Sequence, residues 1–284
     1  MPSRPARFAV IGNPIAHSRS PEIHAAFAAQ TGRTLVYERL LAPPDGFAAA
    51  VDAFRAQGGS GLNVTVPFKP GAFAYARRRT PRATLAGAVN TLAFDGDDAL
   101  GDNTDGAGLV ADLRGRCGLA LDGLAVLLLG AGGAARGVVG PLLEAGVARL
   151  AIANRTAERA HALVGELRGR LPEALGARLS ACALHEAPAG ADLIVNGTAA
   201  GLSDAALSLP AGVWRGPRLA VDMVYGAAPT AFMRAALEAG CPRAEDGLGM
   251  LVGQAAESFA LWHGERPDPG PVVAMLRERL ARPA

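Results

Sequence analysis

One lysine stands out among the residues that could carry out chemistry. Lys69 is the only lysine in the chain, and arginine fills every other basic position. Arginine keeps its proton at any physiological pH, whereas a desolvated lysine can release its proton. A chain that otherwise uses arginine would keep lysine where a proton has to move. The alternative is that Lys69 is an ordinary surface residue that remained lysine by chance. We therefore expect proton transfer at Lys69.

Asp105 is the candidate carboxylate partner of this lysine. It ends the run Asp-Asn-Thr-Asp at residues 102–105, directly before an expected helix. One acidic residue at that place would be an ordinary first-turn or turn residue. Four polar residues in succession are more than a helix start requires. Helix capping and catalysis both fit Asp105, and in the second case its carboxylate would hold the ammonium group of Lys69.

A glycine pattern marks a second candidate site. Residues 130–135 read Gly-Ala-Gly-Gly-Ala-Ala, between an apolar strand expected at 124–129 and a helix expected to reach about residue 145. Glycines there permit a tight turn and close approach to a pyrophosphate, which the helix N-terminus stabilises. A P-loop is excluded because it needs a lysine after the glycines. The pattern predicts a dinucleotide site.

The next strand end indicates which dinucleotide. NAD-binding folds place Asp or Glu about 20 residues past the glycines, where it binds the ribose hydroxyls. Residues 154–159 instead read Asn-Arg-Thr-Ala-Glu-Arg, without an acid at the strand tip. Arg155 and Arg159 are placed to meet a 2′-phosphate, although Arg159 could equally be an ordinary helix-surface residue. The segment favours NADP over NAD.

The elements that position Lys69 follow a regular order. Strands expected at 7–12, 35–41 and 62–66 alternate with helices at 22–30 and 44–56. This order predicts a parallel sheet whose loops gather at the carboxyl ends of the strands, where open α/β sheets bind ligands.

Several polar residues fall in these strand-end segments. Ser20 before Pro21 suits a helix N-cap, which leaves the hydroxyl of Ser18 unexplained. Thr65 directly precedes the lysine segment. Farther along, residues 88–101 read as a hairpin. The basic run at 77–79 reads as a solvated helix end, favoured by the helix dipole.

Composition limits the possible functions. The 284 residues suit two domains, and a net charge of +2 is too small to make nucleic acid or an anionic membrane the main partner. We see no secretory signal and no membrane span. The three cysteines and five histidines are scattered, so we expect a reduced cytoplasmic protein without a metal. We expect a monomer or homodimer, although no residue pattern decides between them.

The expected fold is α/β with two domains. Residues 1–106, completed by C-terminal helices at 247–284, would form a substrate domain with a mainly parallel sheet. Residues 107–246 would form a Rossmann-type NADP-binding domain. A lysine and a carboxylate on one domain and a dinucleotide site on the other fit a hydride-transfer enzyme that binds a small polyhydroxylated substrate in the cleft between them.

Eight segments resemble the shikimate dehydrogenase family. They read GNPIAHSRSPEIH, NVTVPFK, AGAVNT, GDNTDG, GAGGAARG, NRTAER, VDMVY and DGLGMLVGQAAESF, in this order from Gly12 to Phe259. The resemblance implies NADPH-dependent, reversible reduction of 3-dehydroshikimate to shikimate in aromatic amino acid biosynthesis.

The resemblance also implies roles for single residues. The catalytic pair would be Lys69 and Asp105. The substrate contacts would be Ser18, Ser20, Thr65, Asn90, Tyr225 and Gln254. The NADP contacts would be Gly130, Ala131, Gly132, Gly133, Ala134, Asn154, Arg155, Thr156, Arg159, Met223 and Gly247.

Two positions depart from the family pattern. Pro81 stands where many relatives carry an acidic residue near the cofactor, so we assign no such contact. Alanines at 199 and 200 replace serines that often follow the Asn-x-Thr segment. Neither departure affects the catalytic pair.

Three alternatives can be compared with this interpretation. The nearest alternative is a member of the family that oxidises quinate or uses NAD. Arg155 argues against NAD, and the serines at 18 and 20 fit shikimate. Glutamyl-tRNA reductase has a similar NADP unit but needs an N-terminal cysteine, and the first cysteine here is Cys117. A non-enzymatic NADP-sensing module would have no use for Lys69 and Asp105.

Overall fold

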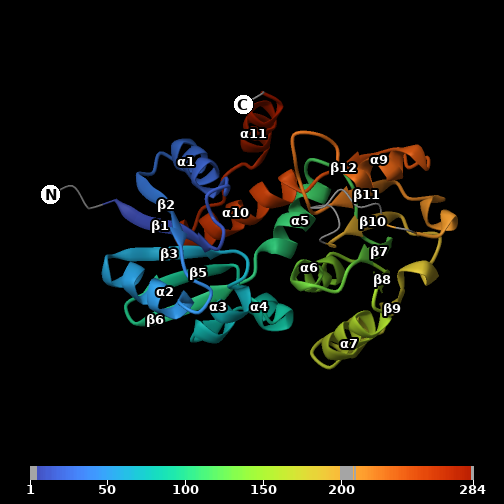
Figure 1. Ribbon diagram of the computed structural model, residues 1–284, viewed down its shortest axis with the longest axis horizontal. Helices are drawn as coiled ribbons and strands as arrows, with labels where there is room; N and C mark the ends of the chain where they lie inside the picture. Colours follow the sequence, from blue (N-terminus) through green and yellow to red (C-terminus); the bar gives the residue numbers. More distant parts are fainter. Residues whose placement is uncertain (1–4, 199–206, 208, 283–284) are drawn as a thin grey trace. The chain divides into compact units, whose positions relative to one another are not determined.

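The chain divides into two compact units, and the computed structural model describes its residues 5–198, 207 and 209–282 (Figure 1). Unit 1 comprises Met1–Gly108 and Val252–Val272, and unit 2 comprises Leu109–Leu251 and Val273–Ala284. The alanines at 199 and 200 lie outside the described residues. In this division the start of the helix at 248–263 and most of the C-terminal helix belong to unit 2, whereas the sequence predicts that residues 247–284 complete the first domain.

Unit 1 contains a six-stranded sheet with the strand order β2-β1-β3-β5-β6-β4. Three of its five pairings are parallel, and the β5–β6 hairpin supplies antiparallel ones. Its elements are β1 (Ala6–Gly12), α1 (Ser20–Gln30), β2 (Leu35–Leu41), α2 (Phe47–Ala56), β3 (Gly59–Val64), α3 (Lys69–Tyr75), β4 (Arg78–Arg79), α4 (Pro81–Ala86), β5 (Thr91–Asp95), β6 (Asp98–Asp102) and the first turn of α5 (Asp105–Arg114), with most of α10 (Leu248–His263). The predicted α/β class, the mainly parallel sheet and the hairpin are confirmed.

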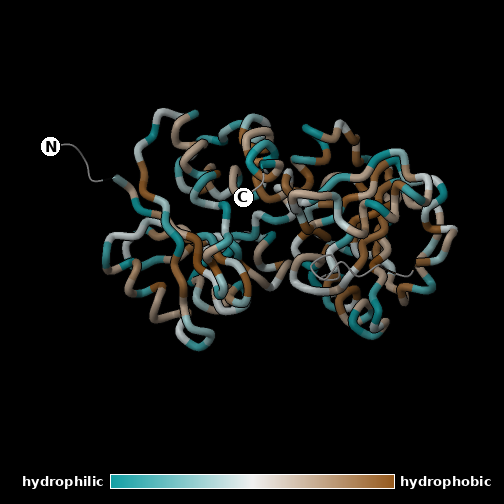
Figure 2. The backbone as a smooth tube through the Cα atoms, turned by 45° about the horizontal axis from the view of Figure 1, so that its top comes forward, coloured by the Kyte–Doolittle hydropathy of each residue, from teal (hydrophilic) through white to brown (hydrophobic). Residues whose placement is uncertain are grey.

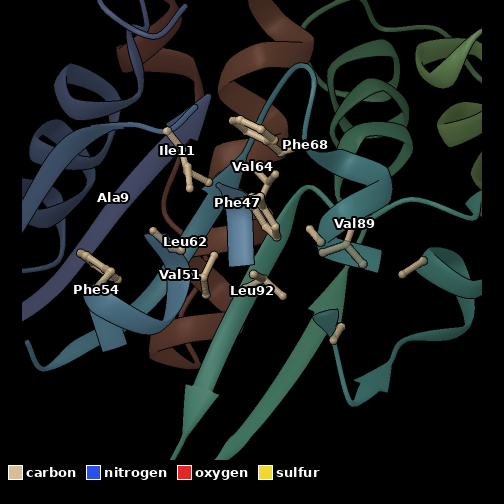
Figure 3. Close-up of a cluster of buried hydrophobic side chains, with 14 residues drawn as sticks. Ala9, Ile11, Phe47, Val51, Phe54, Leu62, Val64, Phe68, Val89 and Leu92 are labelled. Atoms are coloured by element: carbon tan, nitrogen blue, oxygen red, sulfur yellow. The ribbon is translucent and has the colours of Figure 1, made fainter. Parts of the chain in front are cut away.

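Helices cover both faces of this sheet. On one face, Val51 and Phe54 of α2 pack with Ile11 of β1, Leu62 of β3 and Leu92 of β5 (Figure 3). On the other face, Trp262 of α10 stacks on Phe8 of β1, and aromatic side chains of α1 pack against Phe259 of α10; Figure 1 shows these two helices beside the sheet. Alternation along each strand sends successive side chains to the two layers, so burial on both faces fixes the strand register.

The basic run at residues 77–79 is not a helix end, so that prediction was wrong. Helix α3 ends at Tyr75, and Arg78–Arg79 forms the short edge strand β4, which pairs with β6. Both arginines remain exposed. Charged side chains on a short edge strand discourage pairing with another chain, which explains why a polar run is tolerated in a sheet.

Unit 2 contains the second sheet, with the order β12-β11-β10-β7-β8-β9 and parallel pairings throughout. This is the strand order of the doubly wound dinucleotide-binding fold. Its elements are β7 (Ala125–Leu129), α6 (Gly133–Glu144), β8 (Arg149–Asn154), α7 (Ala157–Arg168), α8 (Glu173–Gly176), β9 (Leu179–Ala183), η1 (Leu184–Glu186), β10 (Leu193–Asn196), η3 (Ala211–Trp214), β11 (Leu219–Asp222), α9 (Ala231–Glu238), β12 (Ala244–Glu245) and α11 (Gly270–Ala281), which begins in unit 1. The predicted Rossmann-type sheet is confirmed.

The central strand of unit 2 is buried on both faces, as its uninterrupted apolar sequence predicts. All five residues of β7 are buried, and Leu127 and Leu129 pack with Phe232 of α9. Apolar segments run through the interior of each unit (Figure 2). No helix in residues 5–198, 207 and 209–282 is both long and apolar enough to cross a membrane.

Glycine allows two helices of unit 1 to approach closely. A Cβ at Gly108 of α5 would lie 2.3 Å from the backbone nitrogen of Gln254 in α10, and one at Gly253 would lie 2.7 Å from the carbonyl oxygen of Gly108. Backbone atoms cannot move aside as a flexible side chain can. Only glycine at both positions lets α5 and α10 meet at this distance, which places Gln254 beside the start of α5.

We expect Gly108→Ala to destabilise the protein by about 2 kcal/mol, because the added methyl group has to push the two helix backbones apart. Urea unfolding monitored by circular dichroism measures the change. Gly165→Ala in α7 is the matched control, because a Cβ there meets nothing within 4 Å. It should stabilise by about 0.5–1 kcal/mol. Equal effects of the two substitutions would contradict the close-approach argument.

Candidate functional site

Lys69 and Asp105 form an ion pair in unit 1. Each is the first residue of a helix, α3 and α5 respectively, and each follows a strand-end segment. The Lys69 ammonium donates to Asp105 Oδ2 at 2.5 Å, with side-chain exposures of 25% and 9%. The lysine thus keeps access to solvent while the carboxylate is nearly enclosed. The structure brings together the two residues that the sequence proposed as a pair.

Asn90 fixes the other carboxylate oxygen of Asp105. Its Nδ2 donates to Asp105 Oδ1 at 2.8 Å, and its Oδ1 accepts from the backbone N–H of Thr104 at 2.9 Å. A backbone N–H can only donate and a carboxylate can only accept, so the amide has one satisfactory orientation. Gln254 Oε1 lies 3.4 Å from the same Nδ2. Asn90, Asp105, Lys69 and Gln254 therefore form one cluster.

The two serines near the start of α1 do not occupy its N-cap position. We expected Ser20 to be the N-cap, and this prediction was wrong: Arg19 occupies that position without a side-chain capping bond, and Ser20 begins the helix. Ser18 Oγ lies 3.2 Å from Ser20 Oγ and accepts from the Ser20 backbone N–H. Two adjacent hydroxyls on a helix start can bind an anionic group.

Thr65 follows β3 and belongs to the same strand-end edge as the serines. Its backbone N–H donates to Ile11 O at 3.0 Å, which fixes the loop against the end of β1. A Cβ at Gly12 would lie 2.5 Å from Thr65 Cγ2. Glycine at position 12 therefore makes room for the threonine, whose side chain is partly exposed.

A buried polar network lies behind these residues. Asn63 accepts at Oδ1 from Tyr37 Oη at 2.7 Å, and its Nδ2 donates to Ser258 Oγ at 2.9 Å. His24 Nε2 lies 3.2 Å from Asn63 Oδ1, while His24 Nδ1 is buried without a partner among the described residues. An unpaired acceptor costs less than an unpaired N–H, so the ring proton belongs on Nε2.

Burial lowers the pKa of His24 from 6.5 to about 3, with the bond to Asn63 opposing the shift and His263 adding to it. The unfolded chain takes up the proton as pH falls below about 6.5, while the folded ring stays neutral. Stability linked to His24 is therefore complete above about pH 6.5 and is lost progressively toward pH 3, by about 2 kcal/mol at pH 5.

His24→Phe tests this pH dependence, because phenylalanine keeps a ring against Tyr37 but cannot titrate. We expect the difference in unfolding free energy between pH 7.5 and pH 5 to be about 2 kcal/mol smaller in the variant than in the unsubstituted protein. Urea midpoints at the two pH values measure it. Identical pH dependence in both proteins would show that His24 does not stay neutral.

The first aspartate of the 102–105 run has a structural role. Arg82 donates to both carboxylate oxygens of Asp102, at 2.7 and 2.5 Å, and Thr80 donates at 2.6 Å. Burial alone would raise the pKa of Asp102, but these hydrogen bonds and the charge of Arg82 outweigh it and lower the pKa. Asp102 therefore stays ionised and anchors the segment that ends at Asp105.

The glycine turn of unit 2 has the geometry of a phosphate site. Gly130 has a φ of +102°, and a Cβ there would lie 3.0 Å from the carbonyl oxygen of Gly197. Helix α6 starts at Gly133, and its N-cap, Gly132, provides no side-chain cap. A Cβ at Gly132 or Gly133 would meet nothing within 4 Å. Backbone N–H groups at an uncapped helix start, with open space before them, suit a pyrophosphate.

Two arginines extend from the neighbouring strand end. Arg155 and Arg159 are both exposed, and neither guanidinium has an ion pair or hydrogen bond to another described residue. Asn154 Nδ2 donates to Thr156 O at 2.9 Å, which shapes the turn that carries them. Uncommitted guanidinium groups at this end of β8 suit a 2′-phosphate, so the residues fit NADP.

Met223 and Gly247 lie against each other in unit 2. A Cβ at Gly247 would be 2.1 Å from Met223 O, so any side chain at 247 would displace the strand end. Asp222, next to Met223, is buried and accepts from Thr230 Oγ1 at 2.7 Å and from Asn196 Nδ2 at 3.1 Å. Tyr225 follows in the same segment and is partly exposed.

Most predicted residues fall into two groups. Unit 1 holds the ion pair with its amides, together with the two serines and Thr65. Unit 2 holds Tyr225, Met223, Gly247 and the glycine and arginine turns. Three buried polar residues of this site, His24, Thr91 and Ser258, were not predicted from the sequence. Ser258 could have been noticed because it follows Gln254 by four residues and so shares its helix face.

Comparisons with known proteins agree along the chain. The family described as "Shikimate dehydrogenase substrate binding domain" matches residues 10–92, "Shikimate / quinate 5-dehydrogenase" matches 114–202, and "Shikimate 5'-dehydrogenase C-terminal domain" matches 247–277. A protein of Bordetella petrii named "Shikimate dehydrogenase (NADP(+))" is 58% identical over 279 residues, which cover 96% of each chain.

Solved structures agree as well. An Ael1 enzyme from Pseudomonas putida has a TM-score of 0.89 at 43% identity, covering 98% of this chain and 99% of its own. The shikimate 5-dehydrogenase of Thermus thermophilus, solved in complex with NADP(H) and shikimate, has a TM-score of 0.82 at 36% identity. It covers 97% of this chain and 100% of its own.

Proposed function

Because the chain belongs to the shikimate dehydrogenase family, we propose that it catalyses the NADPH-dependent, reversible reduction of 3-dehydroshikimate to shikimate. Within the chain, the main support for this proposal is the Lys69–Asp105 ion pair. Asn90 holds its carboxylate at the strand-end edge of the sheet. A proton donor that keeps solvent access next to a fixed carboxylate suits the reduction of a ketone to an alcohol.

We assign cofactor binding to unit 2. The backbone from Gly130 to Ala134 would hold the pyrophosphate at the start of α6, and the segment from Asn154 to Arg159, with Thr156 between them, would hold the adenosine 2′-phosphate. Met223 and Gly247 would line the nicotinamide position. NADPH supplies the hydride that adds to the carbonyl carbon.

Proton transfer would occur at Lys69 Nζ. During reduction, the ammonium donates a proton to the oxygen that was the ketone, so that the product leaves as a neutral alcohol. In the reverse direction, the free amine accepts the hydroxyl proton. Asp105 holds Nζ in place through Oδ2, and Asn90 keeps the carboxylate from rotating by binding Oδ1. Fixed geometry at the proton donor lowers the barrier because no reorientation is needed.

Substrate binding would use neutral hydrogen-bonding groups. The hydroxyls of Ser18 and Ser20, which lie 3.2 Å apart at the start of α1, would bind the substrate carboxylate. Thr65, Asn90 and Gln254 would bind ring hydroxyls, and Tyr225 of unit 2 would add a further contact. These binding residues favour a small polyhydroxylated acid, because an apolar ligand would leave the polar groups of the site without hydrogen bonds.

The decisive test mixes the protein with NADP and shikimate and follows the absorbance of the reduced cofactor. Parallel reactions with NAD, and with quinate, measure the selectivity for each partner. We expect turnover with NADP and shikimate to exceed the other combinations. No signal with NADP and shikimate would refute the proposed function.

We also propose a cytoplasmic location and a monomer or homodimer. All three cysteines are free, and Cys117 and Cys241 are buried, which suits a reducing compartment. Sedimentation or light scattering would give the oligomeric state.

A further inference from the structure

Two fully buried hydroxyls stand between the groups that the proposed function uses. Thr91 begins β5, directly after Asn90, and Ser258 lies on α10, one turn after Gln254. Both residues are 0% exposed, so neither can touch a ligand. Burying a hydroxyl in a core is unfavourable unless it is hydrogen-bonded, and alanine or valine would pack there at lower cost. We therefore expect these two hydroxyls to have a role that an apolar side chain could not fill.

The hydroxyls of Thr91 and Ser258 connect Asn90 with Asn63. Thr91 Oγ1 lies 2.7 Å from Ser258 Oγ and donates to Asn90 Oδ1 at 2.9 Å. On the other side, Asn63 Nδ2 donates to Ser258 Oγ at 2.9 Å and to Thr91 Oγ1 at 3.2 Å. Through Asn90, this pair of hydroxyls reaches the carboxylate of Asp105.

The network continues beyond Asn63. Asn63 Oδ1 accepts from Tyr37 Oη at 2.7 Å. The bonds thus run without interruption from Tyr37, through Asn63 and the two hydroxyls, to Asn90 and the ion pair. A network in which every member is bonded is rigid, because moving one group breaks the bonds of its neighbours.

We propose that Thr91 and Ser258 are positioning residues that hold the Asn90 amide, and through it the Asp105 carboxylate, in the orientation needed for proton transfer. Oδ1 of Asn90 accepts from Thr104 on one side, through its backbone N–H at 2.9 Å and its hydroxyl at 3.2 Å, and from the Thr91 hydroxyl on the other, which contacts Ser258 Oγ at 2.7 Å. Without the Thr91 hydroxyl, Asn90 would be held by Thr104 alone and its amide could tilt. The Nδ2 donor would then leave Asp105 Oδ1 for part of the time.

The inference rests on the proposed function, and two matched substitutions of Thr91 test it. Thr91→Val removes the hydroxyl and keeps the shape, whereas Thr91→Ser keeps the hydroxyl and loses a methyl group. We expect Thr91→Val to lower kcat about tenfold and Thr91→Ser to keep kcat within about twofold of the unsubstituted enzyme. Thermal unfolding should show a similar loss of stability in both variants, because Thr91→Val loses buried hydrogen bonds and Thr91→Ser loses a buried methyl group. A purely structural role would make kcat follow stability and would overturn the proposal.

A double-mutant cycle tests whether the effect passes through Asn90. Ser258→Ala should lower kcat in the unsubstituted enzyme but have almost no further effect in an Asn90→Ala background. In an Arg155→Ala background the effect of Ser258→Ala should remain whole, because Arg155 takes no part in the network. Additive effects with Asn90→Ala would overturn the proposal.

The unsubstituted enzyme separates the two hypotheses. If it does not turn over NADP with shikimate, the proposed function fails. If it does, and Thr91→Val keeps full kcat, only the positioning role fails. Should Thr91→Val fold poorly, Ser258→Ala and Ser258→Cys test the same role at the partner position, because both remove its hydroxyl. A loss of kcat in both is expected, and normal kcat in either one would contradict the proposal.

Discussion

Lys69→Arg should lower kcat about 10³-fold while NADP binding stays unchanged. Arginine keeps the positive charge and can still pair with the carboxylate of Asp105, which lies 2.5 Å from the lysine nitrogen. It cannot give up its proton at physiological pH, so the step that moves a proton to or from substrate oxygen would fail. Steady-state turnover with NADP and shikimate, together with NADPH fluorescence titration, measures the two quantities.

Two controls make this result specific. Thermal unfolding should show a melting temperature close to that of the unsubstituted enzyme, because the charge at position 69 is kept and the side chain is partly exposed. Asp105→Asn removes the partner instead and should also lower kcat, since the ammonium then loses its anchor. Near-normal turnover of Lys69→Arg would remove the lysine from the mechanism.

Arg155→Ala should reduce the preference for NADP over NAD about 100-fold. The guanidinium is exposed and has no bond to other described residues, so its removal costs the fold little. Bound to a 2′-phosphate, it would form charge-assisted hydrogen bonds worth about 1.5–3 kcal/mol, and NAD lacks that phosphate. The ratio of kcat/KM values for the two cofactors measures the change.

Arg149→Ala is the matched control for this prediction. Arg149 is an exposed arginine at the opposite end of β8, so its loss changes the net charge equally but removes nothing from the strand end that carries Arg155. Its cofactor preference should stay within about twofold of the unsubstituted enzyme. Equal losses of affinity for NADP and NAD in Arg155→Ala would argue against recognition of the 2′-phosphate.

Features that depend on neighbouring residues were predictable from the sequence. The glycine turn before α6, the arginine turn after β8 and the β5–β6 hairpin were each expected from a few adjacent residues, because turn geometry, helix starts and strand alternation act over short distances. The uniqueness of Lys69 was likewise visible in the composition. These local signals were enough for the α/β class and for the proposed NADP site.

Local signals also misled in two places. Ser20 before Pro21 has the pattern of a helix cap, yet its hydroxyl lies 3.2 Å from that of Ser18 and makes no capping bond. The basic run at residues 77–79 was expected to end a helix, yet Arg78–Arg79 pair with β6 as strand β4. For the basic run, a partner outside the segment decided the structure, and a local pattern does not contain that partner.

The sequence by itself therefore determined which residues could carry out chemistry: the lone lysine, the aspartate before a helix, and the glycine and arginine turns. Only the tertiary structure decided which of them meet. Asp105 joins Lys69 across 36 residues of chain, and Asn63 joins Ser258 across 195. Such pairs form because burial forces each polar group to find a partner wherever packing brings one, and packing depends on the whole chain.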